Sequence, residues 1–326
     1  MLNFSFKLMQ IFTKFEKMKV VSLFSGAGGL DLGFMKAGFE VIWANDFDED
    51  ACKTYAHNIG EHIIHGNISS ISSDLIPDCD VVIGGFPCQG FSQANLKRSN
   101  DDDRNQLYLE FLRIVTDKKP KYFVAENVRG ILSLDNGNAI KKIIDDFQNA
   151  GYQIQYQLFN TADYGVPQTR FRVIIIGIRN DIDHEYTFPL PTHISPTKKN
   201  PLGLKHWISI SEALTNIKDP EEDTQNLKNH IYSQYKVTNR NFTGHRETDP
   251  NKPSPTILAR GNGKGGVCAI QHPKNHRRMS IRESALIQTF PIDFEFSGSM
   301  TSCYRQVGNA VPVLFAETIA KSLCQE

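Results

Sequence analysis

Short apolar runs alternate with amphipathic segments over residues 18–180 of the chain. Each run is rich in β-branched or aromatic residues and is bounded by turn signals, which favours a buried strand. Several of the segments between them place apolar residues on one side of a helical period. The predicted strands are Lys19–Phe24, Glu40–Asn45, His62–Asn67, Asp80–Gly84, Tyr122–Glu126, Gln153–Phe159 and Arg172–Ile178. The predicted helices are Leu30–Ala37, Glu49–Asn58, Leu107–Thr116 and Ala139–Ala150.

This alternation predicts an α/β fold with a doubly wound, mostly parallel, Rossmann-like sheet of seven strands. After Arg179 the alternation is lost, and prolines and polar residues dominate. We therefore place a domain boundary near residue 180. Two further helices are predicted at Ser280–Thr289, which has apolar residues on one face, and at Val313–Leu323, which closes the chain.

A glycine-rich turn, Phe24-Ser25-Gly26-Ala27-Gly28-Gly29, follows the first predicted strand. Glycines there let the backbone approach a ligand and expose N–H groups at a helix N-terminus. About twenty residues on, the second strand ends in Asp46-Phe47, an acid placed to bind a ribose diol and a ring that can stack on adenine. The pattern predicts a nucleoside-containing cofactor. It leaves NAD and S-adenosylmethionine open, although the dinucleotide fingerprint is not matched.

The fourth predicted strand ends in Gly84-Gly85-Phe86-Pro87-Cys88-Gln89-Gly90-Phe91-Ser92. This turn presents one thiol at a strand end, where α/β folds bind their ligands, and an ionised cysteine is a strong nucleophile. A lone cysteine is more often a small buried hydrophobe.

Charged side chains end or begin two other predicted strands. Glu126 ends one of them and is either a salt-bridge partner or a general acid. Arg170 and Arg172 alternate by two, so an extended segment places both on one face, where they would lower the pKa of a nearby thiol. Isolated arginines at strand starts are more often surface ion pairs.

With 326 residues, 40% hydrophobic and 22% charged, the composition is that of a soluble globular protein. No apolar run approaches the length of a membrane span. Residues 1–17 lack the cleavage site of a secretion signal and are interpreted as an N-terminal extension. The six cysteines show no close pairing, which is typical of reduced thiols in a cytosol, and no metal-ligand cluster is found.

The formal net charge is zero, but the charges are unevenly distributed. Between Lys228 and Arg282, eleven Lys and Arg residues stand against two acids. This excess predicts a phosphate-binding face, although a solvated basic surface is the commoner origin of such runs. Glycines between the charges of Arg260-Gly261-Asn262-Gly263-Lys264-Gly265-Gly266 favour close approach to a polyanion.

Taken together, residues 18–325 resemble the DNA (cytosine-5)-methyltransferase family, of the bacterial restriction–modification type. Each motif is short, but all occur in the family's order and at its intervals. The motifs are Phe24-Ser25-Gly26-Ala27-Gly28-Gly29, Gly85-Phe86-Pro87-Cys88-Gln89, Glu126-Asn127-Val128, Gln168-x-Arg170-x-Arg172, Pro255-Thr256-Ile257 and Gln306-Val307-Gly308-Asn309-Ala310-Val311-Pro312.

The resemblance implies that the Cys88 thiolate adds to carbon 6 of a cytosine flipped out of double-stranded DNA. Glu126 would hold the ring and donate a proton, and Arg172 would contact the ring carbonyl oxygen. Arg170 would set the electrostatics around the thiol and a backbone phosphate. The methyl group would come from S-adenosylmethionine, with S-adenosylhomocysteine as the product and no metal.

The resemblance also implies the binding residues and the domains. The cofactor residues would be Phe24, Gly26, Gly28, Asp46, Phe47, Asn67, Ile68, Pro87, Leu107, Asn309 and Val311. The DNA-binding residues would be Gln89, Ser92, Arg104, Arg240, Arg260, Lys264 and Arg277. Residues 18–180 and 303–326 would form the catalytic domain, and 181–302 the target-recognition domain. Asn67 departs from the family, which has Asp there; we expect altered cofactor affinity.

Three other functions are weighed against this one. A tRNA cytosine-5 methyltransferase would share the catalytic motifs, and a catalytically silent DNA-binding regulator would share the fold. A dehydrogenase would use the glycine turn alone.

We expect a monomer in the bacterial cytoplasm, associated with the nucleoid and not with a membrane. A cognate restriction endonuclease would share its target site, without forming a stable complex with it.

Overall fold

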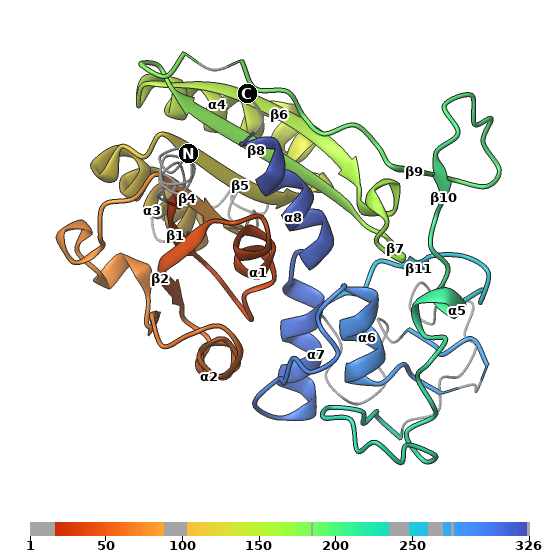
Figure 1. The fold of residues 1–326 in the computed structure, drawn as a ribbon. Helices are drawn as coiled ribbons and strands as arrows, with labels where there is room; N and C mark the ends of the chain where they lie inside the picture. Colours follow the sequence, from red (N-terminus) through yellow and green to blue (C-terminus); the bar gives the residue numbers. More distant parts are fainter. Residues whose placement is uncertain are drawn as a thin grey trace, which may run out of the picture.

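A seven-stranded sheet forms the centre of the computed structural model, which describes residues 17–87, 103–183, 185–234, 248–259, 270–274 and 277–324 (Figure 1). The strand order is β3-β2-β1-β4-β5-β8-β6. The strands are β1 (Lys19–Leu23), β2 (Glu40–Asp46), β3 (Ile63–His65), β4 (Val81–Gly84), β5 (Tyr122–Val128), β6 (Tyr152–Asn160) and β8 (Phe171–Arg179). Strand β8 runs antiparallel to both of its neighbours, while the other pairs are parallel. The predicted α/β, mostly parallel sheet is therefore confirmed.

Helices cover both faces of this sheet. They are α1 (Gly29–Lys36), α2 (Glu49–Asn58), α3 (Asp103–Lys118), α4 (Asn138–Asn149) and α8 (Val313–Ser322). Figure 1 shows α8 beside α1, which are the last and the first helix of the described residues. The C-terminal helix therefore belongs to the same layer as the first glycine turn.

Two apolar cores lie on opposite faces of the sheet. Successive residues of one strand divide between them: Val20 belongs to the core under α1 and α8, and Val21 to the core under α3 and α4. Side chains of a strand alternate between faces, so a strand buried on both faces needs consecutive apolar residues. This explains why the apolar runs, rather than an alternating pattern, predicted the sheet.

The described part of the chain between β8 and α8 contains three two-residue strands and three helices, of which α7 is the longest. They are β9 (His193–Ile194), β10 (Lys205–His206), α5 (Ile210–Ala213), β11 (Ser254–Pro255), α6 (Ile281–Ile287) and α7 (Met300–Asn309). Strand β11 pairs with β7 (Gln168–Thr169), which directly precedes β8. A third apolar core joins α5, α6 and α7 and reaches Ala27 in the glycine turn.

Most element boundaries agree with the sequence within a few residues. The strand predicted at His62–Asn67 is observed as β3, which is shorter because it ends before the turn at Gly66. The predicted helix Ser280–Thr289 is α6, for which Ser280 and Glu283 form a reciprocal capping box. The sequence analysis did not predict α7 or the two-residue strands. No helix among the described residues is long and apolar enough to cross a bilayer.

The crossing of α1 and α8 depends on the missing side chain of Gly33. A Cβ there would lie 2.4 Å from the Ala316 Cβ and 2.6 Å from the Glu317 backbone nitrogen. We predict that Gly33→Ala lowers the free energy of unfolding by about 1–3 kcal/mol despite the better helix propensity of alanine. Urea denaturation checks this, with Lys36→Ala on the exposed side of α1 as control. Equal stability of the two variants would contradict it.

Candidate active site

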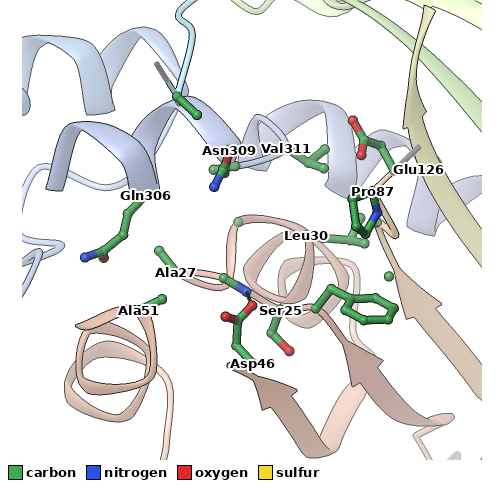
Figure 2. A pocket seen from close by; sticks show the side chains of 18 of the residues that line it. Ser25, Ala27, Leu30, Asp46, Ala51, Pro87, Glu126, Gln306, Asn309 and Val311 are labelled. Carbon is green, nitrogen blue, oxygen red and sulfur yellow. Dashed lines mark hydrogen bonds between the residues drawn. The ribbon is translucent and has the colours of Figure 1, made fainter. Parts of the chain in front are cut away.

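A cavity of about 470 Å³ opens at the carboxyl ends of β1, β2, β4 and β5. Ligands of open α/β sheets bind at this edge, because the turns after parallel strands meet there. Figure 2 shows residues from far apart in the chain around it: Asp46 and Ser25 on one side, Asn309 and Val311 on another, and Glu126 beside Pro87. Residues of the predicted cofactor site and of the predicted catalytic site therefore line the same cavity.

The glycine turn after β1 forms the floor of the cavity. Gly26 has a φ of 55°, and a Cβ there would meet no protein atom within 4 Å, so the backbone faces open space. A Cβ on Gly29 would lie 2.5 Å from the Val311 carbonyl oxygen. The segment around Asn309 and Val311 therefore packs directly against the turn.

Asp46 ties the end of β2 to this turn. One of its carboxylate oxygens accepts a hydrogen bond from the Gly26 backbone nitrogen at 2.8 Å, and the other accepts one from Asp48 at 2.8 Å. Burial raises the pKa of Asp46, and these backbone donors act against the shift. The neighbouring Phe47 ring is 72% exposed at the cavity wall, which leaves an aromatic face free for stacking.

Glu126 and Arg172 form a buried ion pair on the opposite side of the cavity. The Arg172 Nε lies 2.5 Å from Glu126 Oε1, and each side chain is about nine-tenths buried. The N–H direction is not aligned for a hydrogen bond, so the attraction is between charges. A second Arg172 nitrogen donates to the Phe171 carbonyl oxygen at 2.7 Å. The pair presents a carboxyl group and a guanidinium side by side.

Arg170 also lines the cavity, but it is more deeply buried than its neighbour. Its side chain is 1% exposed, and it donates to the carbonyl oxygens of Ile257 and Gly308, each at 2.9 Å. Burial lowers the pKa of Arg170, and the nearby charge of Arg172 adds to the effect. The expected phosphate contact does not fit this placement. Arg170 instead holds two backbone segments.

Cys88 lies outside the described residues, but the turn that leads to it is described as far as Pro87. Pro87 lines the cavity. The Asn127 side chain donates to the Phe86 carbonyl oxygen at 2.9 Å, which ties this turn to the end of β5. A Cβ on Gly85 would lie 2.9 Å from Glu126 Oε2, so only glycine leaves room for the carboxylate.

Most of the predicted cofactor residues line the cavity: Phe24, Gly26, Asp46, Phe47, Pro87, Leu107, Asn309 and Val311. Gly28, Asn67 and Ile68 are not among the residues that line it, and their cofactor contacts stay predictions. Gly28 has a φ of 84° and packs against Tyr55, while Ile68 is buried in the core under α3 and α4. The Asn67 side chain accepts hydrogen bonds from the backbone and hydroxyl of Ser69, so it caps a short 3₁₀ helix.

The predicted DNA-binding residues are mostly beyond the described part of the chain. This holds for Gln89, Ser92, Arg240, Arg260 and Lys264, and for the side chain of Arg104 in α3. Arg277 is described, and its placement does not support the predicted contact with DNA. Its guanidinium is buried between Asp219, at 2.5 Å, and Glu283, at 2.8 Å. Arg278 and Arg282, two further cations of the basic run, are also buried. Part of the positive charge counted in the sequence therefore lies in the interior and not on the surface.

Sequence reasoning missed several residues that line or shape the cavity. Gln306 and Ile257 lie within motifs that the sequence analysis quoted, but neither was singled out there. Asn127 stands beside Glu126 in its motif, which was the available signal for its contact with Phe86. No pattern indicated Asp31, which is fully buried in the first turn of α1 and also lines the cavity.

The parallel sheet with one antiparallel strand beside its edge, and the glycine turn after β1, define a Rossmann-like methyltransferase fold. The solved S. pombe Dnmt2 methyltransferase shares this fold, with 21% identity and a TM-score of 0.70 over 94% of this chain and 98% of that one. The family model for the C-5 cytosine-specific DNA methylases matches residues 18–325. The chain therefore belongs to that family and is a DNA cytosine-5-methyltransferase.

Two relatives cover nearly the whole chain. Type II methyltransferase M.NgoFVII of Neisseria gonorrhoeae is 42% identical over 94% of this chain and 87% of its own length. Type II methyltransferase M.FnuDI of Fusobacterium nucleatum is 39% identical over 94% of both chains. Matches of this extent include the sheet and most of the region between β8 and α8.

The buried acid Asp31 gives a prediction for the pH dependence of stability. Tyr55 donates to one carboxylate oxygen at 3.0 Å, while the other has no hydrogen-bond partner among the described residues. Burial raises the pKa of Asp31 from 3.8 to about 6. The folded state therefore binds this proton more tightly than the unfolded state, and stability falls as the pH rises from about 4 to 6.

Asp31→Asn removes this titration. We predict that the stability of the variant, relative to the parent, improves by about 2 kcal/mol between pH 4.5 and pH 8, at about 1.4 kcal/mol per pKa unit. Urea denaturation at the two pH values measures it. Parallel pH profiles of the two proteins would contradict the buried, titrating carboxyl group.

Proposed function

We propose that Cys88, Glu126 and Arg172 carry out the C-5 methylation of a cytosine flipped out of double-stranded DNA. The observation that supports this most is the Glu126–Arg172 ion pair at 2.5 Å, in the same cavity as Pro87. Pro87, Glu126 and Arg172 line this cavity, and Cys88 follows Pro87 directly in the sequence, which supports its role as the nucleophile.

The chemistry assigns one task to each residue. The Cys88 thiolate attacks carbon 6 of the ring, which leaves carbon 5 as the nucleophilic end of an enamine. Glu126 in its protonated form donates to ring nitrogen 3 as negative charge develops there. Arg172 stabilises the ring carbonyl oxygen. Loss of the carbon 5 proton after methylation releases Cys88 and restores the aromatic ring.

The cavity fits S-adenosylmethionine, which supplies the methyl group when bound. The open space above Gly26 admits a ligand at the glycine turn, where a side chain would project into the cavity. The Asp46 carboxylate is placed to accept hydrogen bonds from a ribose, and the exposed Phe47 ring offers a stacking face for adenine. Asn309 and Val311 would close the site from the C-terminal side.

The division into domains follows the same proposal. Residues 18–180 and 303–326 form the catalytic domain, and residues 181–302 recognise the target sequence. The Type II names of the relatives support a role in restriction–modification, in which methylation protects host DNA from a cognate endonuclease. We propose a monomer that acts on chromosomal DNA in the bacterial cytoplasm.

Incubation with methyl-labelled S-adenosylmethionine tests the substrate. Duplex DNA and tRNA are offered separately, and the labelled DNA is then sequenced after bisulfite treatment. The expected result is label in DNA alone, with protected cytosines at a fixed sequence. Label in tRNA alone would reject the DNA substrate, and uniform label without a sequence preference would reject target recognition.

Cys88→Ser is predicted to abolish turnover and to retain DNA binding, because a hydroxyl is a far weaker nucleophile at neutral pH. The parent protein should form a covalent complex with a duplex that carries 5-fluorocytosine, and the variant should not. Cys324→Ser changes an exposed thiol near the C-terminus and is the matched control. Turnover by Cys88→Ser near the parent rate would remove Cys88 from its assigned role.

A further inference from the structure

Two buried glutamines and Arg170 join the backbone segments that line the cavity from the C-terminal side. Ile257 lies in one of these segments, and both of its peptide groups bind side chains. Its nitrogen donates to Gln168 Oε1 at 2.9 Å, and its oxygen accepts from Arg170 at 2.9 Å. Gln168 and Arg170 are both nearly inaccessible to solvent. The position of Ile257 is therefore set by two side chains of the segment that directly precedes β8.

Gln288, at the end of α6, extends this network to the other segment. Its side-chain oxygen accepts from Gln168 Nε2 at 2.8 Å. Its side-chain nitrogen donates to the carbonyl oxygens of Val307 at 2.7 Å and Ala310 at 3.2 Å. Gln288 is 0% exposed and belongs to none of the motifs that define the family resemblance.

The two segments also meet directly. A Cβ on Gly308 would lie 2.4 Å from the Ala259 backbone nitrogen and 2.5 Å from the Leu258 carbonyl carbon. With so little space, a shift of residues 307–310 must move residues 257–259 as well. Gly308, Asn309 and Ala310 line the cavity on one side of this contact, and Ile257 and Leu258 on the other.

We propose that Gln168 and Gln288 are positioning residues for the cofactor site. Neither lines the cavity, but together they fix the carbonyl groups on both sides of Asn309 and the backbone of Ile257. A buried polar network that loses one member leaves its partners unpaired, so the segments it holds shift to find new partners. The inference rests on the proposed use of S-adenosylmethionine.

The test measures binding of S-adenosylhomocysteine by calorimetry, without DNA, to the parent protein and to Gln288→Met. Methionine keeps much of the volume and removes all three hydrogen bonds. We expect the Kd to rise at least tenfold, while kcat at saturating cofactor stays within threefold of the parent. A Kd within twofold of the parent would overturn the proposal, as would a loss of kcat equal to the change in Kd.

Two further variants separate positioning from folding. Tyr152 lies on β6, away from the cavity, and its hydroxyl donates a buried hydrogen bond to the Pro120 carbonyl oxygen, so Tyr152→Phe should leave the Kd unchanged. If Gln288→Met does not fold, Gln288→Glu keeps the length and an acceptor for Gln168 and loses the donor. The same rise in Kd is then expected, and an unchanged Kd overturns the proposal.

The double variant Gln168→Met/Gln288→Met tests whether the pair acts as one unit. Its Kd should match that of the single variant that binds S-adenosylhomocysteine more weakly, because the effects of substitutions in one network are not additive. Independent, multiplying effects would contradict a shared network. If the parent protein itself does not bind S-adenosylhomocysteine, the cofactor assignment fails, whereas normal parent binding with unaffected variants defeats this inference alone.

Discussion

The antiparallel pairing of β8 with β5 is the constraint on which the rest of the site depends. Val128 faces Arg172 across the two strands, so Glu126, two residues earlier, projects from the same face as the arginine. Long side chains at such diagonal positions reach one another. The resulting ion pair is nearly buried, and removing either partner would leave an uncompensated charge in the interior. A slip of one residue would separate the two groups.

The remaining parts of the site are brought to this pair by close backbone contacts. Gly85 lies against the Glu126 carboxylate, and Gly29 against the Val311 carbonyl oxygen. Buried polar side chains then fix the segments that glycine allows to approach, as Asp46 does for the glycine turn. The cavity is therefore built from both ends of the chain, which explains why the C-terminal helix packs beside α1.

The sheet and the residues at the carboxyl ends of its strands could be predicted from the sequence, because strands buried on both faces are continuous apolar runs. It placed Glu126 and Arg172 together through the resemblance to a family. It could not show that Arg277 is enclosed by Asp219 and Glu283, since a local count of charge contains no information about burial. Gln288 gave no local signal, because its three partners are distant in sequence and two are backbone carbonyl groups.

The central proposal is that Glu126 and Arg172 act on the cytosine ring together, Glu126 as the proton donor and Arg172 at the ring carbonyl oxygen. The most direct measurement is the single-turnover rate of methyl transfer for Glu126→Gln, Arg172→Lys and the double variant, with saturating DNA and cofactor. The account predicts that each single variant is slower by about a hundredfold or more and that the double variant is barely slower than the worse single one. Rates near that of the parent, or losses that multiply, would contradict it.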